Sequence, residues 1–223
     1  MYLLKNSVGR KIIMSVTGFT MLTFVIVHLV GNASIYDGPD GINTYAAALH
    51  HNSTFLLAVR LTLLGFCSLH VFFGTLLTLR NNAAKPQGYA VNKSLSATFA
   101  SKNMIWTGLL VAVFIIYHLL HFTFQVTNPE ISAFKHLDAK GRHDVFTMIV
   151  LSFRHLFIAL AYVCGVGILG LHLSHGIQSS IQTVGLNSRK IFPFILKSGM
   201  ILWIIIFLGF SSFPIAILTG IFK

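Results

Sequence analysis

The sequence predicts an all-α membrane protein in which residues 1–223 form a single transmembrane domain, a bundle of five membrane-spanning helices. Hydrophobic residues make up 55% of the chain and charged residues only 9%, and the mean hydropathy is +0.78. A soluble domain of this size does not need so much apolar surface. The apolar residues also gather in runs of about 20 or more, which as helices cross a hydrocarbon core of roughly 30 Å.

Five such runs give the expected helices and use up most of the chain. They cover about residues 12–35, 56–80, 104–126, 155–179 and 194–222. The connections between them are short, which excludes a separate soluble catalytic domain. The first run is longer than the apolar core of a signal peptide and ends without a clear cleavage site, so we interpret it as an uncleaved span. No internal repeat is apparent, and Pro214 is expected to bend the last helix.

The charged residues predict that the N-terminus lies inside and the C-terminus outside. The net charge is +11, but the basic residues lie at the ends of apolar runs rather than in a patch, which favours membrane orientation over nucleic-acid binding. Ten of the 16 Lys and Arg residues are then cytoplasmic: Lys5, Arg10, Lys11, Arg80, Lys85, Lys93, Lys102, Arg189, Lys190 and Lys197. The acidic residues all fall in the two outer connections: Asp37, Asp40, Glu130, Asp138 and Asp144. The polar inner connection 81–101 is a candidate contact for a soluble partner, and the outer connection 127–154 is expected to form an ordered cap.

Six of the eleven histidines fall within the apolar runs, where ionisable side chains are costly and usually serve a function in the bundle interior. They are His28, His70, His118, His121, His172 and His175. One such histidine could be a hydrogen-bonded core residue, but six on four helices are hard to explain in that way. Four histidines in the outer connections could lie near an outer quinone site: His50, His51, His136 and His143. Arg154 and His155 stand at the outer membrane boundary, where they could pair with a haem propionate.

Depth groups four of these histidines into two pairs, because a helix rises about 1.5 Å per residue. His28 and His118 lie roughly 5 to 7 Å to the outer side of their span midpoints, and His70 and His172 roughly 4 to 9 Å to the inner side. Two imidazoles at one level are the geometry of bis-histidine haem ligation, in which both axial positions are filled and single electrons are transferred. The sequence thus predicts two stacked haem b groups, with iron ligands His70 and His172 for the inner and His28 and His118 for the outer.

Spacing alone leaves His121 and His175 open as alternative ligands, since each lies three residues beyond a stronger candidate on nearly the same face. Four glycines near the predicted ligands fit either the space that a porphyrin needs or helix packing by small residues. They are Gly31, Gly74, Gly165 and Gly176.

Four motifs together resemble the single-subunit, five-helix, di-haem cytochrome b of succinate dehydrogenases (succinate:quinone oxidoreductases) and quinol:fumarate reductases. The resemblance covers nearly the whole chain. The motifs are His28-Leu29-Val30-Gly31-Asn32, Leu69-His70-Val71-Phe72-Phe73-Gly74, Tyr117-His118-Leu119 and His172-Leu173-Ser174-His175-Gly176. In this family the ligands match the histidine of the His-Leu pair and the first histidine of H-x-S-x-G. The resemblance therefore implies His118 and His172 as ligands in preference to His121 and His175.

The resemblance also implies partners and an activity. It implies a flavoprotein subunit carrying FAD and an iron-sulfur subunit on the cytoplasmic face of the cell inner membrane, with the dicarboxylate chemistry in those partners. This chain would be the quinone-reactive subunit, with menaquinone as the expected quinone. Some relatives carry a glutamate two residues before the helix-four ligand, where this chain has Gly170, which argues against a transmembrane proton path through a carboxylate. Candidate carboxylates for a quinone site are then Asp37, Asp40, Glu130 and Asp144.

Two other readings compete with this one. The first is a di-haem cytochrome b of another redox complex, such as the anchor of a hydrogenase or formate dehydrogenase, or a cytochrome b561-like reductase. The second is a transporter that uses intramembrane histidines for a transition metal or for protons. The transporter is disfavoured because the carboxylates that commonly accompany such relays are missing from the spans.

Overall fold

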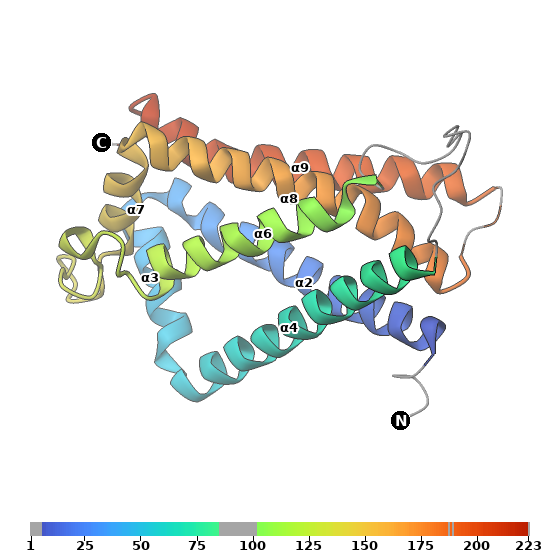
Figure 1. Ribbon diagram of the computed structural model, residues 1–223. Coiled ribbons are helices and arrows are strands. Elements are labelled where there is room, and N and C mark those ends of the chain that lie inside the picture. Colours follow the sequence, from blue (N-terminus) through green and yellow to red (C-terminus); the bar gives the residue numbers. More distant parts are fainter. Residues whose placement is uncertain (1–5, 85–101, 187, 189, 223) are drawn as a thin grey trace.

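A computed structural model describes residues 6–84, 102–186, 188 and 190–222, which form an elongated bundle of helices (Figure 1). Within these residues five helical segments are long and apolar enough to span a membrane, as the sequence predicted. They are Ser7–His51, Ser53–Ala83, Met104–Thr123, Leu156–Thr183 and Phe192–Leu218. The start of the first and the end of the last lie at opposite ends of the bundle. We call these the inner and outer ends, after the predicted topology.

The long helices begin within about five residues of the predicted positions, but the third ends as an α-helix at His118 instead of near residue 126. They are α2 (Ser7–Ala33), α4 (Ser53–Ala83), α6 (Met104–His118), α8 (Leu156–Thr183) and α9 (Phe192–Leu218). Asn6 and Asn52 extend the first two beyond the apolar runs, because their side chains accept from free backbone N–H groups at the helix starts. α9 is one continuous helix through Pro214, near its end.

Large apolar side chains cover the outside of the bundle. One example from each long helix is more than half exposed: Val27, Leu64, Val113, Phe157 and Ile205. Water would penalise such a surface, whereas a bilayer covers it and the helices satisfy their own backbone groups. The fold is therefore that of a multi-pass membrane protein.

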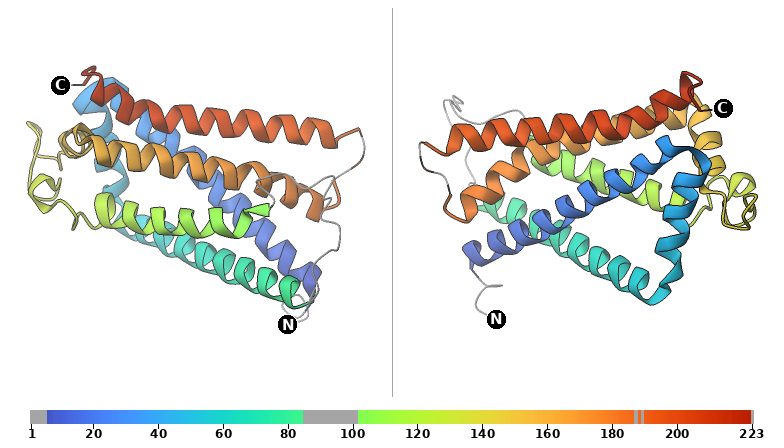
Figure 2. Two further views of the ribbon diagram at one scale, coloured as in Figure 1. Left: turned by 45° about the horizontal axis from the view of Figure 1, so that its top comes forward. Right: turned by 180° about the vertical axis from the view of Figure 1, so that it is seen from behind.

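An ordered cap closes the outer end, and part of it was not predicted. Helix α3 (Gly38–His51) follows the short helix η1 (Ser34–Asp37) in the connection between the first two predicted spans, where no helix was predicted. Figure 2 shows α2, α3 and α4 as three sides of a triangle, because α2 and α4 diverge toward the outer end and α3 joins them there. The ordered cap predicted for 127–154 is confirmed by η3 (Pro129–Ile131) and α7 (Val145–Arg154).

Asn43 of α3 links the two halves of this cap. The Asn43 side chain is 0% exposed. Its Nδ2 donates to Asp138 Oδ2 and to Asp144 Oδ1, at 3.2 Å each, and its Oδ1 accepts from the backbone N–H of Phe146 at 2.9 Å. A buried amide with both ends satisfied fixes the orientation of the segments it joins.

The predicted contact for a soluble partner, 81–101, lies mostly outside the described residues. Only its first residues, Asn81 to Ala84, are described, and they form the exposed end of α4 and the turn after it.

Candidate functional site

The inner pair of histidines faces across the bundle. His70 of α4 and His172 of α8 have ring centroids 6.3 Å apart and ring planes at 70°. The two residues lie on helices that are not consecutive in the chain, so the bundle and not local sequence brings them together. Both side chains are partly buried.

The outer pair repeats this arrangement on the other two helices. His28 of α2 and His118 of α6 have ring centroids 5.9 Å apart and ring planes at 82°. Phe24 stacks on the His28 ring with a centroid distance of 5.3 Å. The Asn32 amide donates to the His28 carbonyl at 2.7 Å and lies 3.3 Å from each ring nitrogen, Nδ1 and Nε2.

Both separations suit a metal ion held between two imidazoles. Two imidazoles that bind one metal from opposite sides, each through a metal–nitrogen bond of about 2 Å, have ring centres about 6 Å apart. Among the described residues no three His, Cys, Asp or Glu side chains gather as a metal-ligand group. The donor set is thus two neutral nitrogens per site, which fits a metal whose other ligands come from a macrocycle such as haem.

The two pairs lie at different depths. Thr17, which contacts the inner pair, and His28 of the outer pair are both on α2 and are 11 residues apart. A helix of that length rises about 16 Å. The pairs are therefore stacked along the bundle axis rather than side by side.

Each inner histidine contacts a threonine of the neighbouring helix, which the sequence interpretation missed. Thr17 Oγ1 lies 3.1 Å from His70 Nδ1, and Thr107 Oγ1 lies 3.2 Å from His172 Nδ1. A signal for both was present, because Thr-Gly followed by nine residues and then His occurs twice, at Thr17 and at Thr107. Each occurrence ends at a histidine of the outer pair.

His121, one of the two alternative ligands, lies beside the outer pair, and its buried Nε2 has no hydrogen-bond partner among the described residues. It lies in a π-helical turn, η2 (Leu119–Thr123), which continues α6. The His121 side chain is 3% exposed, and its Nδ1 lies 2.9 Å from Tyr162 Oη. Its ring stacks on Phe122 at 4.1 Å. The ring is thus held in an aromatic cluster beside the outer pair.

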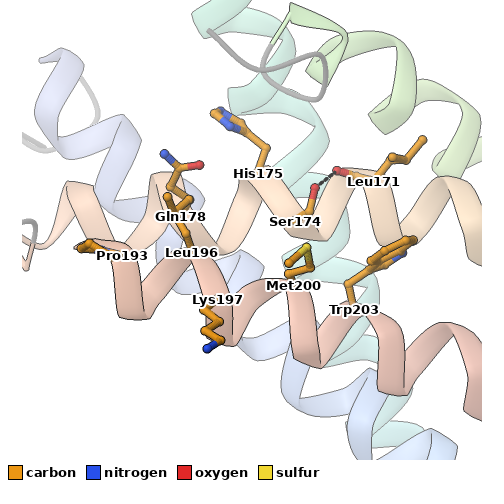
Figure 3. A pocket seen from close by; sticks show the side chains of 9 residues that line it. All are labelled: Leu171, Ser174, His175, Gln178, Pro193, Leu196, Lys197, Met200 and Trp203. Carbon is orange, nitrogen blue, oxygen red and sulfur yellow. Dashed lines mark hydrogen bonds between the residues drawn. The ribbon is translucent and has the colours of Figure 1, made fainter. Parts of the chain in front are cut away.

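His175, the other alternative, lines an open cavity of about 520 Å³ between α8 and α9. Its Nδ1 is buried and has no hydrogen-bond partner among the described residues. Figure 3 shows that the side chains of His175 and Lys197 point in opposite directions, while Ser174 donates to the Leu171 carbonyl at 2.8 Å. The polar groups of this cavity therefore do not converge on one point.

Helix packing accounts for the glycines at two of the four positions singled out in the sequence. A Cβ on Gly31 would overlap the ring of Tyr45, and a Cβ on Gly165 would overlap the ring of Phe114. The other two face methionine side chains: Gly74 and Gly176. At Gly31 and Gly165 the space is filled by aromatic side chains of neighbouring elements.

Several of the candidate residues near the outer boundary form ion pairs or hydrogen bonds within the cap. Asp40 forms an ion pair with Arg142 at 2.8 Å, and Asp144 accepts from the first turn of α7 at 3.1 Å. Three histidines donate to backbone carbonyls: His50, His136 and His143. The exposed residues that remain are Asp37, His51, Glu130, Arg154 and His155.

Gly170 occupies the position where some members of the resembled family carry a glutamate. A Cβ at Gly170 would overlap the indole nitrogen of Trp203 on α9. That nitrogen is buried and has no hydrogen-bond partner among the described residues. The indole therefore fills the volume that a side chain at position 170 would need.

A scan against protein-family models finds no match to this chain, and searches of the curated proteins and of the solved structures find no significant match. Function is therefore inferred from the residues and their geometry.

Proposed function

We propose that this chain is the di-haem cytochrome b membrane-anchor subunit of a succinate:quinone oxidoreductase or quinol:fumarate reductase in the cell inner membrane. The observation that carries the proposal is the meeting of four intramembrane histidines as two facing pairs, at two depths, on four helices. Intramembrane ionisable residues are rare and generally functional. The family motifs around the same four histidines support this kind of complex over other redox anchors.

The residues present fit two haem b groups. His70 and His172 would hold the inner iron, and His28 and His118 the outer iron. Bound haem supplies reversible one-electron chemistry. The chain would contribute two histidine nitrogens per site, from helices that are largely apolar. The expected partners are a flavoprotein with FAD and an iron-sulfur subunit at the cytoplasmic, inner end, and a membrane quinone, with menaquinone expected.

Protons of the quinone would be exchanged locally at one membrane face. No Asp or Glu occurs in α2, α4, α6, α8 or α9, and Trp203 fills the space beside Gly170. Of the candidate quinone-site carboxylates, Asp40 and Asp144 are engaged in the cap, whereas Asp37 and Glu130 are exposed. The exposed pair are the carboxylates that we favour for proton exchange.

A reduced-minus-oxidised absorbance spectrum of the purified chain tests the proposal. We expect a b-type α-band and two haems per chain. His70→Ala and His172→Ala should each remove the same haem, and His28→Ala and His118→Ala the other. His121→Ala and His175→Ala are matched controls on the same helices and should retain both.

Two outcomes would contradict the proposal. A colourless wild-type chain would exclude haem binding, and loss of haem on substitution of His121 or His175 would show that the ligands are misassigned. Purification of the intact complex from membranes tests the partners. A flavoprotein with succinate or fumarate activity is expected, whereas a hydrogenase or formate dehydrogenase partner would place the chain in a different redox complex.

A further inference from the structure

The Thr17 hydroxyl fixes the role of each ring nitrogen of His70. Thr17 is 2% exposed, and its Oγ1 lies 2.8 Å from the Ile13 carbonyl and 3.1 Å from His70 Nδ1. A hydroxyl has one proton to donate, and a carbonyl can only accept. Because the proton is used on the Ile13 carbonyl, Oγ1 accepts from the imidazole. His70 therefore carries its proton on Nδ1 and leaves Nε2 with a free lone pair.

The same logic applies independently to His172. Thr107 is 7% exposed, and its Oγ1 lies 3.1 Å from the Met104 carbonyl and 3.2 Å from His172 Nδ1. The hydroxyl donates along its own helix and accepts from the histidine of the neighbouring helix. Both members of the inner pair thus present Nε2 as the nitrogen available for a metal.

A glycine follows each threonine and contacts the same ring. A Cβ on Gly18 would lie 3.4 Å from His70 Cε1, and a Cβ on Gly108 would lie 3.1 Å from His172 Cε1. The second distance is shorter than a comfortable side-chain contact. The glycines therefore let the backbones of α2 and α6 approach the imidazole edges closely.

We propose that Thr17-Gly18 and Thr107-Gly108 are positioning residues that hold His70 and His172 in the Nδ1–H tautomer and thereby lower the reduction potential of the inner haem. This inference rests on the proposed function. An acceptor on the remote N–H raises the basicity of a metal-bound imidazole. A more basic axial ligand stabilises the ferric over the ferrous state. The ring of the outer histidine His28 lies beside the Asn32 amide nitrogen, which can only donate, and not beside a hydroxyl that could accept from it.

The test is a redox titration of the two haems in Thr17→Val and Thr107→Val, since valine keeps the branched shape and removes the hydroxyl oxygen. The Met14 and Met104 carbonyls, which also accept from His70 and His172, remain in both variants. We expect both haems to be retained and the midpoint potential of the inner haem alone to rise. A tenfold change in the ratio of ferrous to ferric affinity equals about 59 mV for one electron. Thr17→Ser and Thr107→Ser keep the hydroxyl and should restore the wild-type potential.

Matched controls lie on the same helix. Thr20 is partly buried and Thr23 is exposed, and each hydroxyl donates to the carbonyl four residues earlier at 3.0 Å, as Thr17 does. Thr20→Val and Thr23→Val should leave both potentials unchanged. Electron paramagnetic resonance of the ferric inner haem gives a second readout, since rotation of either imidazole changes the low-spin signal.

Several results would overturn the inference. One is an unchanged inner potential in both valine variants, and another is an equal shift in the Thr20 or Thr23 controls. If a valine variant loses the inner haem, rescue by the serine variant supports the positioning role, and failure of serine to rescue refutes it. A colourless wild-type chain would refute the proposed function. The nitrogen-15 shifts of His70 and His172 would then still decide the tautomer assignment, because Nε2–H signals would refute it.

Discussion

Replacement of Asn43 by Ala is expected to open the outer cap locally while leaving the long helices in place. The buried Asn43 side chain is the hydrogen-bond acceptor for the backbone N–H of Phe146, itself 8% exposed. Asp138 and Asp144 keep other partners when Asn43 is removed. The cost is therefore mainly the unpaired N–H of Phe146 and the lost amide contacts, together about 2–3 kcal/mol.

Hydrogen exchange followed by mass spectrometry, with the protein in lipid nanodiscs, measures this change. Since about 1.4 kcal/mol corresponds to a tenfold change in an equilibrium constant, the amides at the start of α7 should exchange about 30- to 140-fold faster. Thr44→Ala is the matched control on the same helix, because Thr44 is exposed and only accepts from Arg142. Wild-type protection at Phe146 in the Asn43→Ala protein would refute the reasoning.

Two further predictions follow from the cap and from the packing of the helices. The Arg142 guanidinium beside Asp138 holds the pKa of that carboxyl well below its usual range, so ionised Asp138 favours the folded cap. This stabilisation of the folded cap should be complete at neutral pH and should decline once the pH falls below about 4, the pKa of Asp138 in the unfolded state. Proteolysis of the 127–144 segment would measure the decline, which should be absent in Asp138→Asn. Gly165→Ala should destabilise the contact between α6 and α8, because the new methyl group overlaps the Phe114 ring. A lower thermal midpoint is expected, with recovery in the double variant that also carries Phe114→Ala, and additive losses would contradict the contact.

The long helices and the depth of the histidines could be predicted because both follow from quantities that the sequence carries directly. An apolar run reports its own length, and the rise per residue converts position into depth. Helix α3 could not be predicted in the same way. Its residues are less apolar than those of the long helices. It is held by the packing of Tyr45 against Gly31 and by the Asn43 bonds to residues about 100 positions away.

The threonines of the inner pair illustrate a different limit of sequence reasoning. Thr17, Thr20 and Thr23 all lie in one apolar helix and all donate to a carbonyl four residues earlier. By composition and local bonding they are equivalent. Only the crossing of α2 with α4 selects Thr17, since it places that hydroxyl and no other of the three against His70.

The repeated spacing between threonine and histidine explains how two helices serve both depths at once. In α2 and in α6, 11 residues separate the threonine beside the inner pair from the histidine of the outer pair. Eleven residues are three turns at about 3.67 residues per turn, so both side chains lie on nearly one face, about 16 Å apart along the axis. One inserted residue between them would rotate one side chain by about 100° relative to the other. The spacing therefore fixes both the helix face and the depth of the threonine and the histidine in α2. The same spacing in α6 places its threonine and histidine in the same relation.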